Sequence, residues 1–272
     1  MSLRRANAWG ASQACASALL VGFLLVPVAA LVLTLRWADF LDGLRHPLLL
    51  PALRLSLLTT GTSLALVVVL GSLLAWRIAR NPGRVSRWME AITQLPAVIP
   101  PAVAGVGLLL AFGRRGLFGG WLAAQGIAPA FTTPAVVMAE AFVSAPFFVQ
   151  AAIAAFRRVD ENLLVVARTL GASPFRTFLR VGLPLAGPGL VAGAAMSWAR
   201  SLGEFGATLL FAGNLTGRTQ TLPLAVYTAM ESDLRAAQAL SLVMVAVAFA
   251  LLFVLRRMAP GAALPAPEAR SA

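Results

Sequence analysis

Residues 55–76 read LSLLTTGTSLALVVVLGSLLAW, a run without one Asp, Glu, Lys or Arg. Four further charge-free runs cover residues 6–35, 91–113, 181–199 and 236–255. A helix needs about 20 mostly apolar residues to span a bilayer, and lipid offers the peptide backbone no hydrogen-bonding partner. These runs therefore predict an all-α membrane protein.

Composition excludes several classes of function. The chain has 272 residues, of which 59% are hydrophobic and 12% charged, whereas a soluble domain carries about 25% charged residues. All 22 basic residues are arginine, so the chain has no lysine for a phosphate-binding loop or a Schiff base. Cys15 and His46 stand alone, which excludes an internal disulfide and a Cys/His metal cluster. We expect no metal and no cofactor bound by this chain.

Six membrane spans are predicted, at about 15–35, 55–76, 91–112, 134–156, 184–200 and 236–255. The first follows Arg4 and Arg5, as a secretory signal would, but it is longer than a signal core, so we interpret it as a retained helix. Prolines interrupt the third span and predict a kink. Residues 113–133 are interpreted as a loop with a short helix near Trp121.

Arginine flanks the spans unevenly. With both termini in the cytoplasm, 14 arginines fall on the cytoplasmic side and seven on the other, as the positive-inside rule requires. A nucleic-acid-binding face would gather these arginines on one surface, so we expect no nucleic-acid partner. The chain divides into residues 1–53 (cytoplasmic tip, first helix and external connection), 54–256 (the transmembrane domain) and 257–272 (a disordered cytoplasmic tail).

The polar segment between the fourth and fifth spans has a readable local structure. A helix is predicted over 161–170, and Gly171 can take the left-handed backbone that ends it. Ser173 can cap a second helix that starts at Pro174. The two short helices would lie at the membrane surface, joined by a tight turn.

This segment resembles the cytoplasmic loop of binding-protein-dependent ABC importer permeases. The matching positions are Ala167, Gly171, Val181, Leu183 and Pro184, whereas Val165 and Val166 replace the family's Glu and first Ala. In that family the loop docks on an ATPase subunit. The resemblance therefore implies that residues 157–183, here called the coupling loop, bind an ATPase. The docking candidates are Ala167, Arg168, Thr169, Leu170, Gly171, Ala172, Ser173, Pro174 and Phe175.

Between about residues 54 and 255 the chain is similar to the molybdate, tungstate and sulfate group of these permeases. The stretches that carry this similarity are 95–101 with 112–116, 199–208, and 213–214 with 219–227. The resemblance implies a polytopic bundle of about six helices in the cytoplasmic membrane, with the coupling loop between the fourth and fifth. It also implies a second copy of the chain, ABC ATPase subunits that use ATP and Mg, and an extracytoplasmic substrate-binding protein as partners.

Charged groups inside a membrane usually face a protein interior or an aqueous path. Arg200 and Glu204 are four residues apart, so on one helix they would share a face and could pair, either at the pore or as a structural salt bridge. Glu140 is interpreted as structural, either neutral or paired with an arginine such as Arg200. The candidates for the pore or gate are Pro100, Pro101, Arg200, Ser201, Glu204, Thr208, Asn214 and Gln220.

The sequence thus predicts a non-enzymatic permease subunit that imports molybdate or tungstate. A sulfate or thiosulfate permease is the alternative within the family. A passive anion channel would not need the coupling loop. A membrane-embedded enzyme would need convergent ionisable groups, and only Glu140, Arg200 and Glu204 lie in or near the spans.

Overall fold

The computed structural model describes residues 2–258, and within that range every regular element is helical. The longer elements are α1 (Ser2–Leu33), α3 (Leu49–Arg80), α4 (Arg84–Val98), α7 (Thr133–Arg157), α10 (Leu183–Leu202) and α13 (Leu234–Met258). The shorter ones are α2 (Trp37–Leu44), α5 (Pro101–Phe112), α6 (Gly119–Ala124), α8 (Glu161–Thr169), α9 (Pro174–Thr177), the π-helix η1 (Phe178–Gly182), α11 (Gly206–Ala212) and α12 (Leu222–Ser232). The predicted all-α class is confirmed.

Five helical segments in the described part of the chain are long and apolar enough to cross a membrane. They are Ser12–Leu33, Leu49–Arg80, Thr133–Arg157, Pro174–Leu202 and Leu234–Leu251. The pair formed by α4 and α5 adds a sixth if the two helices together make one span. These segments match the predicted spans, with helix ends displaced by several residues.

The third predicted span differs from the single kinked helix expected over 91–112. It starts earlier, at Arg84, and consists of α4 and α5, which are bent by 113° relative to each other. Ile99 and Pro100 between them have extended backbones, with ψ of 128° and 137°. A proline disfavours helical backbone at the residue before it, so Pro100 acts on Ile99 and Pro101 acts on Pro100. Consecutive prolines therefore break this helix instead of kinking it.

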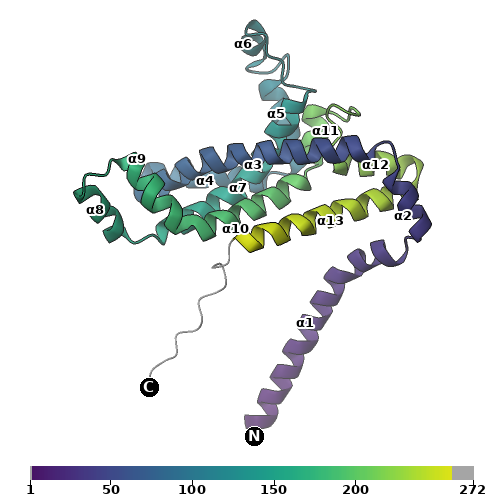
Figure 1. Ribbon diagram of the computed structural model, residues 1–272, viewed down its shortest axis with the longest axis horizontal. Coiled ribbons are helices and arrows are strands. Elements are labelled where there is room, and N and C mark those ends of the chain that lie inside the picture. The colour runs from purple at the N-terminus through teal and green to yellow at the C-terminus, as the bar shows by residue number, and fades with distance from the viewer. Residues whose placement is uncertain (1, 259–272) are drawn as a thin grey trace.

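Helices α3, α7 and α10 form the centre of the bundle, with α13 alongside (Figure 1). Small residues bring them close together. A Cβ added to Gly193 of α10 would lie 2.7 Å from the Cβ of Ala151 in α7, and one added to Gly71 of α3 would lie 2.8 Å from the Phe148 ring. Close approach through small residues is the usual basis of helix packing in membranes.

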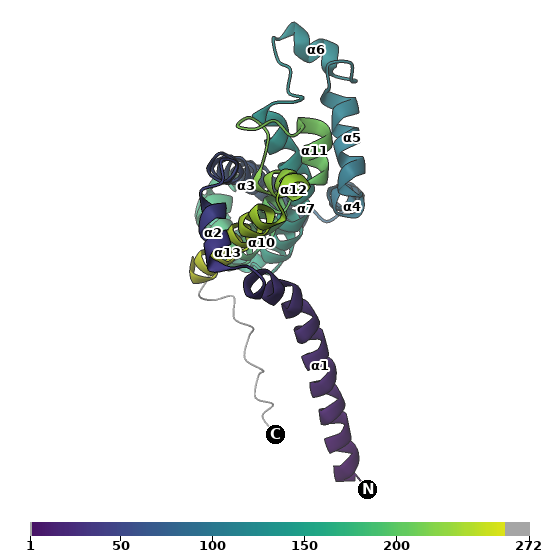
Figure 2. The same ribbon diagram turned by 90° about the vertical axis from the view of Figure 1, so that its right-hand side faces the viewer.

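The two ends of the bundle carry different elements. Helices α8 and α9 lie at one end, and α2 and α12 lie at the other (Figure 1). Helices α5 and α6 project from the side, and α1 diverges from the bundle in both views (Figures 1 and 2). Near its end, α1 meets α13, where Gln238 donates hydrogen bonds to the Thr34 hydroxyl (2.6 Å) and the Leu31 carbonyl (3.3 Å). Trp121 lies in α6, as expected.

The division into 1–53, 54–256 and 257–272 stays a prediction. Arg257 and Met258 belong to α13 and not to a disordered tail, because the helix continues past Arg256. The remainder of the predicted tail, 259–272, lies outside the described residues.

Candidate coupling loop and transport path

The turn of the coupling loop has the predicted local structure. Helix α8 ends at Thr169, and Gly171 has a φ of +83°. A Cβ at Gly171 would meet no atom within 4 Å, so the left-handed backbone alone favours glycine there. Ser173 caps α9 by accepting a hydrogen bond from the Arg176 N–H (3.3 Å), and Pro174 is the first helical residue. The expected helix, turn and cap are confirmed.

The docking candidates form an exposed surface at one end of the bundle. All of them are exposed except Ala167 and Ala172, which are half-buried. Leu170 is 81% exposed, and Phe175, Val165 and Val166 are also exposed. Contiguous exposed apolar side chains mark interaction sites on protein surfaces.

Aromatic packing fixes the base of the coupling loop to the bundle. Phe178 is buried, with its ring 5.3 Å from that of Trp76 and 6.0 Å from that of Phe156. Arg80 donates hydrogen bonds to the carbonyls of Phe156 (2.5 Å) and Val159 (2.9 Å).

The expectation of a separate surface helix after Pro174 is wrong, because α9 and η1 continue into α10 as one helical segment, Pro174–Leu202.

Arg200 and Glu204 form an ion pair with N–O distance 2.9 Å. They do not share a helix face, because α10 ends at Leu202 and Gly203 caps it. Instead the pair closes across the helix end, and a Glu204 oxygen also accepts a hydrogen bond from the Ala207 N–H (2.8 Å) in α11. The Glu204 side chain is 1% exposed and that of Arg200 is 27% exposed, so only the cation reaches the surface.

Glu140 lies buried in α7 and joins that helix to α3. Its carboxyl accepts a hydrogen bond from the Thr59 hydroxyl (2.9 Å), and its second oxygen has no hydrogen-bonding partner among the described residues. No ion pair of Glu140 occurs in the described part of the chain. Of the two alternatives for Glu140, pairing with Arg200 is not formed, because Glu204 takes that guanidinium. A structural role for Glu140 fits this geometry.

The other path candidates fall into two places. Pro101 is close to the start of α11, since a Cβ at Gly206 would lie 3.2 Å from Pro101. Pro100 is exposed at the break before it, whereas Ser201 and Thr208 are buried beside the ion pair in sequence. Asn214 and Gln220 lie in the loop before α12, where both donate to the Thr228 hydroxyl (2.9 and 3.1 Å). These hydrogen bonds tie the loop to α12, and a role for Asn214 and Gln220 at the pore stays a prediction.

An open groove of about 480 Å³ lies between α4, α7 and α10, and the sequence analysis missed it. It is apolar apart from Gln94 and Gln150, and the available signal was an amide side chain inside each of two predicted membrane spans. The Gln150 amide nitrogen has no partner among the described residues. Met196 also lines the groove, one helical turn before Arg200 on α10. We call this the path groove.

Comparison with known proteins identifies the family. Residues 67–261 match the family of binding-protein-dependent transport system inner membrane components. The chain belongs to this family.

Among relatives of this permease is the molybdenum transport system permease protein ModB of Mycobacterium tuberculosis. The two are 46% identical over 226 residues, 83% of this chain and 86% of that protein. The sulfate transport system permease protein CysT of Escherichia coli is 36% identical over 236 residues, 85% of this chain and 84% of that protein.

Solved structures of ABC transporters share the fold. One is a bacterial alginate ABC transporter in complex with an alginate pentasaccharide-bound periplasmic protein, with TM-score 0.74 and 18% identity, covering 94% of this chain and 95% of that one. Another is the MetNI methionine ABC transporter, with TM-score 0.62 and 20% identity, covering 78% of this chain and 95% of that one. The family match and the apolar helices together make this chain a multi-pass inner membrane protein.

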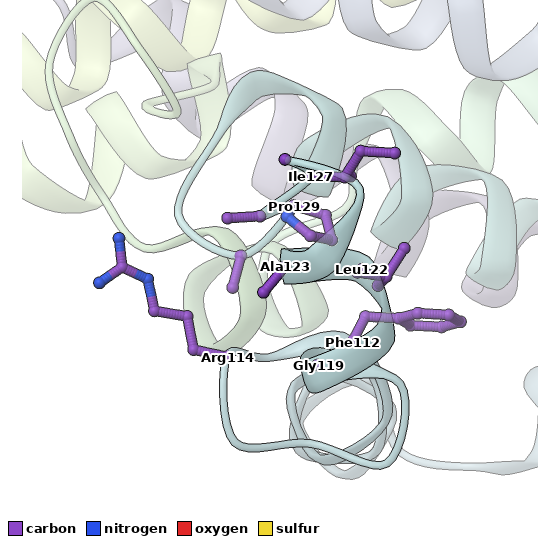
Figure 3. Close-up of a pocket in the computed structure, with 10 residues that line it drawn as sticks. Phe112, Arg114, Gly119, Leu122, Ala123, Ile127 and Pro129 are labelled. Carbon is purple, nitrogen blue, oxygen red and sulfur yellow. The ribbon is translucent and has the colours of Figure 1, made fainter.

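A second cavity in the permease, of about 360 Å³, lies where α5 and α6 meet the segment leading to α7 (Figure 3). Phe112, Leu122, Ile127 and Pro129 line it. Arg114, its one charged lining residue, extends away from Phe112 and Leu122 (Figure 3). Apart from Arg114, the lining of this hollow offers no charged side chain to an oxyanion.

Proposed function

We propose that this permease is the membrane-spanning subunit of an ATP-driven importer of molybdate or tungstate. One observation carries the proposal: the 46% identity to the mycobacterial molybdenum permease, over 83% of this chain. Sulfate is the second candidate substrate, and the 36% identity to the sulfate permease CysT supports it less strongly.

The proposed assembly holds two copies of this chain, two ABC ATPase subunits and an extracytoplasmic binding protein. Both termini lie in the cytoplasm. Leu170 and Phe175 dock on the ATPase, and their exposure in the coupling loop supports this role. ATP and Mg belong to the ATPase subunits, because this chain has no lysine for a phosphate loop.

The anion path needs cationic or donor groups that carry no competing negative charge. Arg200 meets this requirement in part, because its guanidinium is part-exposed while its counterion Glu204 is buried. The path groove continues along the same face of α10 through Met196, and the amide N–H groups of Gln94 and Gln150 supply neutral donors. ATP binding moves the coupling loops and opens the path outward, and hydrolysis returns it to the inward-open state.

Uptake of labelled molybdate into proteoliposomes that contain the permease, its ATPase and its binding protein tests the proposal. We expect ATP-dependent uptake that excess tungstate blocks and sulfate does not. Strong competition by sulfate would assign the chain to sulfate import. Uptake without ATP or ATPase would make it a channel and would remove the proposed role of the coupling loop.

A further inference from the structure

The connection between α3 and α4 places several arginines at one level of the bundle. Helix α3 ends at Arg80, and α4 starts at Arg84 after a short turn in which the Ser86 hydroxyl donates to the Asn81 carbonyl (2.5 Å). This is the end of the bundle that holds the coupling loop, since Arg80 contacts Phe156 and Val159. Because α3 has 32 residues and rises about 1.5 Å per residue, it is longer than the roughly 30 Å hydrocarbon core. Its arginine-bearing end therefore extends to headgroup level.

Arg84 and Arg87 have no counterion within residues 2–258. Both are exposed, and neither side chain has a hydrogen bond or ion pair among the described residues. The carboxylate nearest in sequence, Glu90, is taken by both guanidinium nitrogens of Arg157 (2.7 and 3.2 Å). Positive side chains in the first turn of a helix also oppose its macrodipole. An external anion would compensate this charge.

The two arginines border a hollow of about 400 Å³ that Trp88 and Ala91 complete. Trp88 is 71% exposed. Tryptophan at the edge of a membrane protein usually lies at headgroup level, with its ring against the acyl chains.

A continuous apolar face leads from this hollow along α4. Val85, Trp88, Ile92 and Leu95 are all exposed, and their spacing of three and four residues puts them on one side of the helix. The face extends for about 15 Å at 1.5 Å per residue. We call it the α4 apolar face.

We propose that Arg84 and Arg87 bind the phosphate of an anionic phospholipid, with an acyl chain along the α4 apolar face. Phosphate is the shared chemistry of a lipid headgroup and of free phosphate. The lipid is the source that fits, because free phosphate would leave Trp88, Ile92 and Leu95 uncovered. Basic hollows on the cytoplasmic side of membrane proteins recognise such headgroups. The inference needs the chain to lie in a bilayer, but it does not depend on the transported anion.

Titration of the full-length, detergent-solubilised permease by native mass spectrometry tests the site. The probes are phosphatidylglycerol, phosphatidylcholine and inorganic phosphate. We expect phosphatidylglycerol to bind about tenfold more tightly than phosphatidylcholine, and R84Q/R87Q to remove that difference. R114Q/R115Q is the matched control, since it also removes two exposed arginines, from the connection between α5 and α6. W88A should weaken phosphatidylglycerol binding with both arginines present.

Four results would overturn the proposal. The first is equal binding of the two lipids by the wild-type protein. The second is an equal loss of phosphatidylglycerol binding in R84Q/R87Q and R114Q/R115Q. The third is inorganic phosphate that competes fully with the lipid at equal concentration. In a C15S background, efficient disulfide formation between two copies of W88C in membranes would also overturn it, because a second copy would then cover the α4 apolar face. Unchanged thermal unfolding of R84Q/R87Q verifies that the variant folds.

Discussion

Arg200 and Glu204 lie 2.9 Å apart across the end of α10, and only Arg200 can reach water. Removing Arg200 should therefore change the free energy of unfolding by a different amount than removing Glu204. R200Q leaves a buried carboxylate without its cation and should lower the free energy of unfolding by about 3–5 kcal/mol. E204Q retains an acceptor for Ala207 and leaves a guanidinium that water can solvate, so its cost should be smaller, about 1–3 kcal/mol.

Unfolding in mixed micelles measures both variants. D42N is the control, because the Asp42–Arg45 pair is exposed and its atoms are 3.9 Å apart, so we expect no change there. If E204Q proved more destabilising than R200Q, the cation would be the member that depends on its partner, contrary to the burial of the pair.

The contact between Thr59 and Glu140 predicts that the carboxyl group acts through its hydrogen bond and not through its charge. E140Q keeps an acceptor for Thr59 and should alter the free energy of unfolding by less than about 1 kcal/mol. T59V leaves that acceptor buried and unpaired, which should cost about 1–3 kcal/mol. The same micelle unfolding experiment compares them. A loss in E140Q as large as that in T59V would show that a negative charge is required.

Gly171 should be needed for its backbone geometry. G171A places a side chain at a φ of +83°, which should cost about 1 kcal/mol of stability and disturb the turn. Gly217 offers a matched control, with a φ of +75° and no atom within 4 Å of an added Cβ. Both variants should lose similar stability, but only G171A should reduce co-purification of the ATPase. An equal reduction in G217A would show that the loss comes from general destabilisation.

Leu170 should contribute to ATPase binding without contributing to the fold. L170S removes an 81% exposed apolar side chain, so the unfolding transition should stay where it is. If Leu170 is a central contact, the affinity for the ATPase should fall about tenfold or more. Binding of the purified ATPase to permease in nanodiscs measures this. L117S, at a position that is 87% exposed near α6, is the control. Unchanged affinity in L170S would remove this residue from the docking surface.

Local signals predicted the parts of this structure that depend on neighbouring residues. Charge-free runs located the spans, because a membrane helix must be apolar along its length. The glycine and the capping serine predicted the turn at residues 171–173, because helix ends depend on a few backbone and side-chain bonds.

The features that the sequence did not predict depend on tertiary contacts. The prolines located the break between α4 and α5, but the 113° bend also reflects the packing of α5 on α11, where Gly105 approaches Ala207. The spacing of Arg200 and Glu204 allowed a pair, yet that pair closes beyond the helix and not along it. Helices α11 and α12 escaped prediction because they are short and lie on either side of the loop that holds Gly213 and Gly217. The path groove is lined by residues from three helices, so no single segment of the sequence predicts it.

The uninterrupted helical segment from Pro174 to Leu202 has a mechanical consequence. It has 29 residues, and Arg200 lies 26 positions after Pro174, about 39 Å away at 1.5 Å per residue. A rigid rod of this length that pivots by about 5° at one end displaces the other by about 3 Å, comparable with the length of a hydrogen bond. A small tilt at the coupling-loop end would thus move the Arg200 end of α10 by this distance, together with Glu204 four residues later. The distance moved is the product of this length and the tilt, so the long segment amplifies a small movement at the coupling loop.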